Sequence, residues 1–482
     1  MAFIDLTKAF DTVPRKALWI VLEKLGIPSK MRSIIISFHD GMKAQVIRNG
    51  KVSNPFAVNN GTKQGCVLAP LLFALYFAVM LQHALGNQNL GVPIGFRPTG
   101  GLFNIRRFTA KTKVTIEMLC DVLFADDCAL VAHTRSELQH LMDRFAYSCK
   151  VFGLTISTKK TEIVYQPPPK PQPDQMNTSS CQITVNNVTL TQSGKFQYLG
   201  STITENATLD AEIQFRLAKA SSAFGKLQQR LWSSHNVSLM TKIDVYKAVV
   251  LSALLYGCEA WTPYRRQIQI LDAFHLRRLR SICNISLKDK VTNHEILTKC
   301  RISGIEALLT RAQLRWAGHV VRMENNRLPK IAMYCQLQNY TRPMGRPLLR
   351  YKDKLKYNIG ILGLGEKSWE KTCLDRPVWR ASCHQTITQF EDQQLAKMVV
   401  DKANRKATPQ QSSIGSAFVC SICDKRCKSN AGLKSHMRSH AQQPRVDNTS
   451  PADQQATCRI CGKVCKNSRG LKVHLRVHKN NR

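Results

Sequence analysis

The sequence predicts an α+β domain, followed by a basic helical region and by two small ββα units. Three observations support this prediction. Over residues 1–205, apolar segments of strand length alternate with segments of helical periodicity. From about 209 to 326 the apolar residues recur at helical spacing. Two similar Cys/His units then repeat at 420–440 and 458–478.

The first predicted elements are two helices with a hairpin between them. Residues 14–26 read as a helix, because Pro14 suits its first turn and Gly26 ends it. Asn49-Gly50 is a two-residue hairpin signal. A glycine-bracketed turn at 61–65 precedes an apolar helix over about 68–85.

Residues 116–132 predict two strands with Asp126 and Asp127 at the hairpin tip. Thr134 and Glu137 form a capping box for a helix that ends at Gly153. Further strands are expected within 154–165 and 196–202, on either side of a proline-rich stretch at 167–173.

Charge indicates the class of partner. The 482 residues contain 70 Lys and Arg against 32 Asp and Glu, a formal net charge of +38. Nucleic acid is the expected partner, and a basic surface kept for solubility is the alternative.

Cysteine usage and hydropathy indicate the compartment. The 17 cysteines are an odd number and are scattered, and the N-terminus lacks a signal-peptide pattern. We therefore expect a reducing intracellular location, with nucleus and cytoplasm both open. The longest apolar run, 66–81, contains Pro70 and is shorter than the ~20 residues of a membrane-spanning helix, so no membrane segment is expected.

Three acids suggest metal-dependent chemistry. Asp5 lies in an apolar strand, and burying a carboxylate without a partner is costly. Two Mg²⁺ ions ~3.5 to 4 Å apart are the usual solution where carboxylates and nucleotide phosphates meet in phosphoryl transfer. An Asp-Asp pair alone is weak evidence, because most such pairs are solvated turn residues.

Five motifs strengthen that interpretation. They occur in the order FIDLTKAFDTV, GTKQGCVLAPLLF, LFADDCAL, GLTISTKKTEIV and FQYLG. Together they resemble motifs A to E of reverse transcriptases, most closely those of LINE-type, non-LTR retrotransposons, over about residues 1–330. The resemblance implies an α+β palm and a helical thumb. It also implies RNA-directed DNA polymerase activity on an RNA template, a DNA primer and deoxynucleoside triphosphates, with a DNA target.

The resemblance assigns roles to single residues. Asp5 and Asp126 correspond to the metal-binding acids and Asp127 to the third member of the triad, with two catalytic Mg²⁺ ions. Phe10 resembles the bulky gate that excludes a ribose 2′-hydroxyl; the alternative is a core phenylalanine. Lys160 corresponds to a general acid for pyrophosphate, although Lys159 is adjacent and a solvated lysine is the alternative.

Two turns also have counterparts in the family. Gln64 and Gly65 match the motif B turn that lies against template and nucleotide. Tyr198, Leu199 and Gly200 resemble the primer grip, with a plain hairpin as the alternative.

One departure from the family leaves activity open. In these polymerases a long fingers region precedes the first catalytic strand, whereas Asp5 is here the fifth residue. We expect the chain to correspond to the C-terminal part of a retrotransposon protein, without fingers and without an upstream endonuclease. The alternative function is a catalytically inactive retroelement product that only binds nucleic acid.

The Cys/His units have the spacing of C₂H₂ zinc fingers. In each, CxxC is followed after twelve residues by HxxxH, and each set should bind one structural Zn²⁺. Cys427 and Cys465 are expected to be small core residues instead of ligands. The predicted ligands are Cys420, Cys423, His436 and His440, then Cys458, Cys461, His474 and His478.

The finger helices predict low sequence specificity. Their base-reading positions −1, 3 and 6 lack arginine, so the bidentate contact to guanine is missing. The basic residues that suit phosphate contact are Lys434, Arg438, Lys472 and Arg476. A protein-contact module is the alternative.

These observations define the predicted domains. They are a palm at 1–205, a thumb and helical region at 206–330, a basic mixed region at 331–407, a linker at 408–417, and fingers at 418–440 and 456–478 joined by 441–455. Two further stretches, LLYGCEAW at 254–261 and LRWAGHVVRM at 314–323, resemble segments downstream of such polymerases and carry no recognisable chemistry. His319 within the second is expected to be structural.

Overall fold

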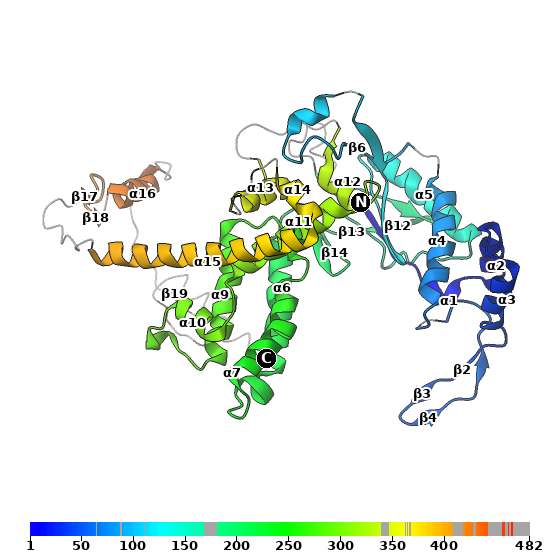
Figure 1. Ribbon diagram of the computed structural model, residues 1–482, viewed down its shortest axis with the longest axis horizontal. Helices are drawn as coiled ribbons and strands as arrows, with labels where there is room; N and C mark the ends of the chain where they lie inside the picture. The colour runs from blue at the N-terminus through cyan, green and yellow to red at the C-terminus, as the bar shows by residue number, and fades with distance from the viewer. Residues whose placement is uncertain are drawn as a thin grey trace. The chain divides into compact units, whose positions relative to one another are not determined.

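The structure is a computed structural model that divides into two compact units, Met1–Val400 and Asp401–Arg482 (Figure 1). Their mixed helix and sheet content agrees with the predicted α+β class. The structure describes residues 1–63, 65–86, 89–110, 112–167, 181–338, 347–361, 363, 365, 368–407, 418–427, 430–441, 456–457, 461 and 464–465.

A five-stranded sheet is the centre of the first 205 residues, with the strand order β13-β10-β1-β9-β8. β1 is antiparallel to both of its neighbours, and β8 and β9 form the predicted hairpin. β13 joins the edge parallel to β10. The bounds are β1 Ala2–Ile4, β8 Asp121–Phe124, β9 Asp127–Leu130, β10 Glu162–Ile163 and β13 Thr191–Gln192.

The sheet is covered on both faces. Ala2 and Ile4 of β1 pack in one core with helices α4 (Ala69–Leu85) and α5 (Arg135–Val151). Successive side chains of a strand point to opposite faces, so Phe3 faces the other way. There it packs against the hairpin of β14 (Lys195–Tyr198) and β15 (Ser201–Thr204).

Local signals in the sequence are confirmed at several elements. Helix α2 (Arg15–Lys24) ends before Gly26, which has φ +79°. Thr134 and Glu137 form both halves of the predicted capping box at α5. Other elements here are α1 Ala9–Thr12, α3 Ser29–Ser37, β11 Thr184–Val185 and β12 Val188–Thr189. Most of the proline-rich stretch lies outside the described residues.

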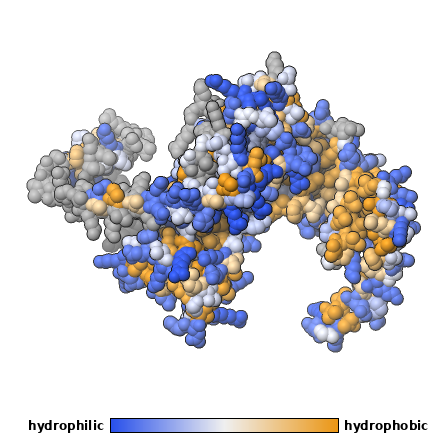
Figure 2. Space-filling model, in the orientation of Figure 1, coloured by the Kyte–Doolittle hydropathy of each residue, from blue (hydrophilic) through white to orange (hydrophobic). Residues whose placement is uncertain are grey.

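The Asn49-Gly50 hairpin is also confirmed, with both residues at positive φ. It joins β3 (Ile47–Arg48) to β4 (Lys51–Val52), and β2 (Lys43–Ala44) pairs with β5 (Phe56–Ala57) beside it. Ile47 and Val52 are exposed there, and apolar atoms are visible at this hairpin in Figure 2.

A second core joins the helices that follow β15. It contains Trp232, Tyr246 and Trp261 among other buried side chains. The helices that contribute to it are α6 Asp210–Lys226, α7 Leu239–Val245, α8 Ser252–Leu254, α9 Arg265–Ile282, α10 Asn293–Cys300 and α11 Ile305–Arg322. The next helix, α12 (Leu328–Tyr334), packs in a separate core with Phe96 and Trp369. Two π-helical turns, Gln228–Trp232 and Tyr246–Leu251, interrupt the α-helical pattern.

A buried histidine in this core makes its stability sensitive to acid. His275 is fully buried and shares a 2.9 Å hydrogen bond with the Tyr246 hydroxyl, and burial lowers the pKa of His275 to about 4. The unfolded chain, with an ordinary pKa of 6.5, binds the proton more readily between these values. We expect the free energy of unfolding to fall by about 3 kcal/mol as pH drops from 7 to 4.

Chemical denaturation across this pH range would measure the effect. The substitution His275→Gln should remove most of this pH dependence. The control substitution His319→Gln, at an exposed histidine, should leave the pH dependence unchanged. If the free energy of unfolding of His275→Gln depended on pH as strongly as that of the wild type, His275 would not be the source of the acid sensitivity.

A third core joins segments that are distant in the sequence. β6 (Val92–Phe96) pairs with β7 (Thr115–Leu119) and with β16 (Cys335–Leu337). Around them pack α11, α13 (Tyr351–Ile361), α14 (Trp369–Leu374) and α15 (Arg376–Ala407). No helix in the described part of the chain is both long and apolar enough to span a membrane.

This core gives LRWAGHVVRM a structural role. The Trp379 indole donates to the Leu314 carbonyl at 3.1 Å and lies directly against Gly318, where a larger side chain would collide with it. His319 is exposed, and its ring centroid lies 5.6 Å from that of Trp316.

The second unit contains a ββα arrangement. β17 (Phe418–Val419) pairs with β18 (Arg426–Cys427), and α16 (Asn430–Ala441) packs on both strands. A second short hairpin consists of β19 (Ala456–Thr457) and β20 (Val464–Cys465).

Candidate functional site

Strand pairing brings the three predicted acids together. Asp5 directly follows β1, and Asp126 and Asp127 lie at the turn between β8 and β9. Ile4 pairs with Cys128, so the next pair in this antiparallel register is Asp5 with Asp127. Ala125, at φ +54°, begins the two-residue turn. The acids therefore cluster at one end of the central strands.

The backbone of Asp5 is held by a segment far along the chain. Its amide donates to Thr161 Oγ1 at 3.3 Å, and its carbonyl accepts from the Ser157 amide at 2.8 Å. Thr161 is buried. Sequence reasoning missed both residues, although they lie in the motif D stretch, because nothing in their pattern shows which strand they contact.

The charges of the acids act on one another. Burial raises the pKa of Asp127 above its ordinary value, and repulsion from Asp126 and Asp5 raises it further. The Lys160 Nζ lies 3.4 Å from Asp5 Oδ2, while the Lys160 side chain is 72% exposed. Lys160 is thus the lysine of the predicted pair that reaches the acids.

One oxygen of this cluster is suited to a cation. Asp5 Oδ2 is inaccessible to solvent and makes no hydrogen bond within the described structure; its contact with Lys160 is a charge contact only. Carboxylate oxygens are the ligands that Mg²⁺ prefers. The chemistry of these donors therefore fits a divalent cation.

The structure describes Phe10 and Gly65, two of the three residues predicted to contact nucleotide and template. Phe10 is half-buried, and its ring centroid lies 4.4 Å from that of Phe73, so it belongs in part to the core. Its carbonyl accepts from the Thr62 amide at 2.9 Å, which links motif A to the start of motif B. Gly65 has φ +88° and open space around it. Gln64 lies outside the described residues.

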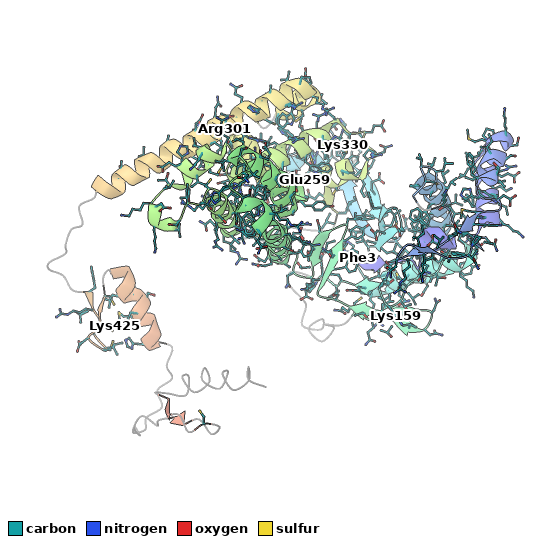
Figure 3. The ribbon with its side chains drawn as sticks, turned by 90° about the horizontal axis from the view of Figure 1, so that it is seen from below. Phe3, Lys159, Glu259, Arg301, Lys330 and Lys425 are labelled. Atoms are coloured by element: carbon teal, nitrogen blue, oxygen red, sulfur yellow. The ribbon has the colours of Figure 1, made fainter. Side chains whose placement is uncertain are left out.

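The Tyr198-Leu199-Gly200 turn lies against the strands that carry the acids. Leu199 and Gly200 have φ of +48° and +80°, as a two-residue hairpin turn requires. The Tyr198 hydroxyl donates to the Val122 carbonyl of β8 at 3.0 Å, and burial raises the pKa of Tyr198 to about 12. The Phe3 ring, labelled in Figure 3, stacks on Phe196 with centroids 4.4 Å apart.

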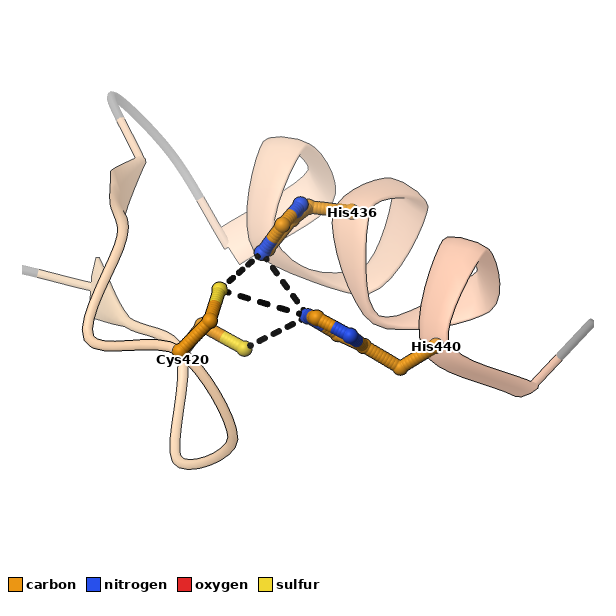
Figure 4. A group of neighbouring side chains, drawn as sticks. Cys420, His436 and His440 are labelled. Atoms are coloured by element: carbon orange, nitrogen blue, oxygen red, sulfur yellow. Dashed lines mark hydrogen bonds between the residues drawn. The ribbon is translucent and has the colours of Figure 1, made fainter. Parts of the chain in front are cut away.

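The first Cys/His unit forms a compact set of metal ligands. The ligand atoms of Cys420, Cys423, His436 and His440 all lie within 4.8 Å of one another. Cys423 Sγ lies 3.0 Å from His436 Nε2 and 3.3 Å from His440 Nε2. Figure 4 shows the side chains converging from the hairpin and from α16. Two thiolates and two imidazoles are the donor set of a tetrahedral structural zinc site.

Cys427 stands apart from this set. It is half-buried on β18, and its sulfur lies 4.0 Å from the Lys425 carbonyl, consistent with the expectation that it is not a ligand. Lys434 is exposed on α16, and Arg438 is on the same helix.

The second unit is described only in part. Cys461 is exposed, whereas Cys458, His474, His478, Lys472 and Arg476 lie outside the described residues.

Comparison with known proteins defines the class of these domains. Residues 1–203 match the family described as reverse transcriptase (RNA-dependent DNA polymerase). Residues 418–441 match a zinc finger of C2H2 type, and residues 457–478 match a second C2H2 zinc-finger family.

Individual relatives point the same way. A putative transposon-derived protein of Caenorhabditis elegans is 26% identical over 277 residues, which are 56% of this chain and 97% of that protein. The RNA-directed DNA polymerase from mobile element jockey of Drosophila melanogaster is 22% identical over 58% of this chain and 28% of its own length. The Pol polyprotein of the type-2 retrotransposable element R2DM, from the same fly, is 24% identical over 53% of this chain and 22% of its own length.

The chain therefore carries a reverse transcriptase domain related to those of non-LTR retrotransposon RNA-directed DNA polymerases, with two C2H2 zinc fingers at its C-terminal end. The matched region spans less than a third of the length of the jockey and R2DM proteins.

Proposed function

We propose that the chain is an RNA-directed DNA polymerase that extends a DNA primer on an RNA template by nucleotidyl transfer. The observation that carries this proposal is the register of β1 against β9, which brings Asp5 opposite Asp127 at the hairpin tip. In this proposal the five-stranded sheet with α4 and α5 is the palm, and the helices from α6 onward include the thumb.

Asp5, Asp126 and Asp127 would hold two Mg²⁺ ions, which supply charge stabilisation to the attacking and leaving oxygens when bound. The carboxylates position the reacting groups and must themselves be ionised. Without the metal ions, burial and the repulsion from Asp126 and Asp5 oppose ionisation of Asp127, and both raise its pKa. Lys160, whose Nζ lies 3.4 Å from Asp5 Oδ2, would give a proton to the departing pyrophosphate.

The remaining residues would hold the substrates. Phe10, anchored on Phe73, would lie beneath the sugar of the incoming deoxynucleotide and select against a 2′-hydroxyl. Gln64 and Gly65 would contact template and nucleotide. The Tyr198–Gly200 turn would hold the primer end beside the acids. The turn is linked to the acid-bearing hairpin by the hydrogen bond from the Tyr198 hydroxyl to β8.

The zinc fingers would anchor nucleic acid, a DNA target included, mainly through phosphates. Lys434 and Arg438, with Lys472 and Arg476 of the second finger, are the proposed contacts, and the net charge of +38 favours such binding.

Primer extension tests the polymerase proposal. The full chain, given a labelled DNA primer on an RNA template, Mg²⁺ and deoxynucleoside triphosphates, should lengthen the primer one nucleotide at a time. EDTA should stop the reaction. Binding of the duplex without extension would instead support the second candidate, a nucleic-acid-binding protein, which the basic charge and the zinc fingers favour.

A further inference from the structure

The Tyr198–Ser201 turn packs against LLYGCEAW, the stretch that carries no recognisable chemistry. The Tyr256 hydroxyl donates to the Leu199 carbonyl at 3.1 Å. A Cβ added to Gly200 would lie 3.4 Å from the Tyr256 ring. Gly257, at φ +73°, approaches so closely that a Cβ there would lie 3.2 Å from Ser201 Oγ. The two segments therefore fit together through a glycine on each side.

A buried ion pair on α6 holds the same turn. The Arg216 Nε lies 2.7 Å from Glu212 Oε1, and both side chains are less than a tenth exposed. Arg216 also donates to the Gly200 carbonyl, and its guanidinium lies 4.5 Å from the centre of the Tyr256 ring. Glu212 Oε2 accepts from the Thr202 amide at 2.7 Å.

These contacts satisfy the polar backbone of the turn from one side. The carbonyls of Leu199 and Gly200 and the amide of Thr202 are bound by side chains that come from α6 and from Tyr256. On its other side the hairpin is tied to the acid-bearing strands through Tyr198 and Phe196. The turn is thus fixed between the proposed catalytic acids and the helical region.

We propose that Glu212, Arg216, Tyr256 and Gly257 form a seat for the Tyr198–Ser201 turn. They are positioning residues that set where the primer end lies relative to Asp5, Asp126 and Asp127. The positioning role rests on the proposed polymerase function. The seat gives LLYGCEAW a role, because its tyrosine and glycine meet the turn directly.

Tyr256→Phe tests the seat, since it removes the hydroxyl that binds Leu199 and keeps the ring beside Arg216. Tyr264→Phe is the matched control, because the Tyr264 hydroxyl accepts from the Leu349 amide at 2.9 Å and, among the described residues, makes no hydrogen bond to the turn. In the full chain, we expect Tyr256→Phe to lower the maximal rate of nucleotide addition about tenfold, as the loss of one orienting hydrogen bond would. The Kd for primer–template, measured by fluorescence anisotropy, should change less than about twofold.

Amide hydrogen exchange tests the seat without relying on activity. Tyr256→Phe should speed exchange in peptides covering 196–204, and Tyr264→Phe should not. Gly257→Ala, strained at its positive φ and crowded against Ser201, should do the same as Tyr256→Phe.

The outcomes distinguish a failure of the seat from a failure of the polymerase proposal. Equal rates and equal exchange in the two tyrosine variants would overturn the seat. If Tyr256→Phe speeds exchange at 196–204 but the wild-type chain extends no primer, the seat is supported, and both the polymerase proposal and the positioning role are overturned. A tenfold rate loss with unchanged primer–template affinity supports all of them.

Discussion

Asp126→Asn should reduce primer extension about 10³-fold or more, because one of the acids that would hold the proposed ions loses its charge and several kcal/mol of transition-state stabilisation are lost with it. The rate of single-nucleotide addition, with enzyme in excess of primer–template, measures this loss. Binding of primer–template should persist, since the basic surface of the protein is untouched.

The same variant should not be less stable than the wild type. Asp126 raises the pKa of Asp127 by repulsion, so removing its charge relieves an unfavourable contact in the folded state. We expect the melting temperature to stay equal or to rise. A large loss of activity together with retained stability is the signature of an acid kept for function.

Asp121→Asn is the matched control for the acid cluster. Asp121 begins β8 and pairs with Leu130, at the far end of the same hairpin, where it accepts from Cys120 Sγ at 3.0 Å. Its replacement should change the rate less than about threefold. A comparable loss in both variants would mean that the hairpin is merely sensitive to mutation, and would remove the support for a specific role of Asp126.

Local features of the site could be predicted because each has a signal in nearby residues. The acid pair lies at a tip between two apolar strands, and the hairpin β8–β9 forms there. The capping box at Thr134 follows from four consecutive residues, and the Asn49-Gly50 turn from two. In each case the backbone conformation depends on the side chains present in the segment itself.

Long-range features could not be predicted. β6 pairs with β16 across some 240 residues, and no pattern in either strand identifies its partner. The seat is likewise a long-range feature, since Tyr256 and Leu199 are 57 positions apart and meet in the region where α6 packs on β15. No sequence signal separates Arg216 from the other basic residues of the helical region, and only its burial beside Glu212 distinguishes it. Such contacts depend on the tertiary fold, which single-sequence periodicity does not encode.

Zinc should be required for the folding of each finger. An isolated ββα unit of this size cannot bury enough apolar surface to be stable, and zinc contributes ~10 to 16 kcal/mol of apparent binding energy to such units. The full chain should therefore contain two zinc ions. Cys420→Ser should lower this to one, because it removes a ligand from the group in which all four atoms lie within 4.8 Å.

Cys427→Ser is the control that makes the zinc experiment specific. Cys427 is a cysteine of the same hairpin as Cys420, so the same substitution can be made at both positions. Its sulfur, however, lies near the Lys425 carbonyl and outside the ligand group. This variant should keep two zinc ions per chain. Zinc released by thiol modification and measured with a chromogenic chelator gives the count, and Co²⁺ substitution gives the thiolate charge-transfer bands of each site. If Cys427→Ser also lost one ion, then Cys427 would be a ligand, and the assignment of Cys420, Cys423, His436 and His440 as the complete set would be wrong.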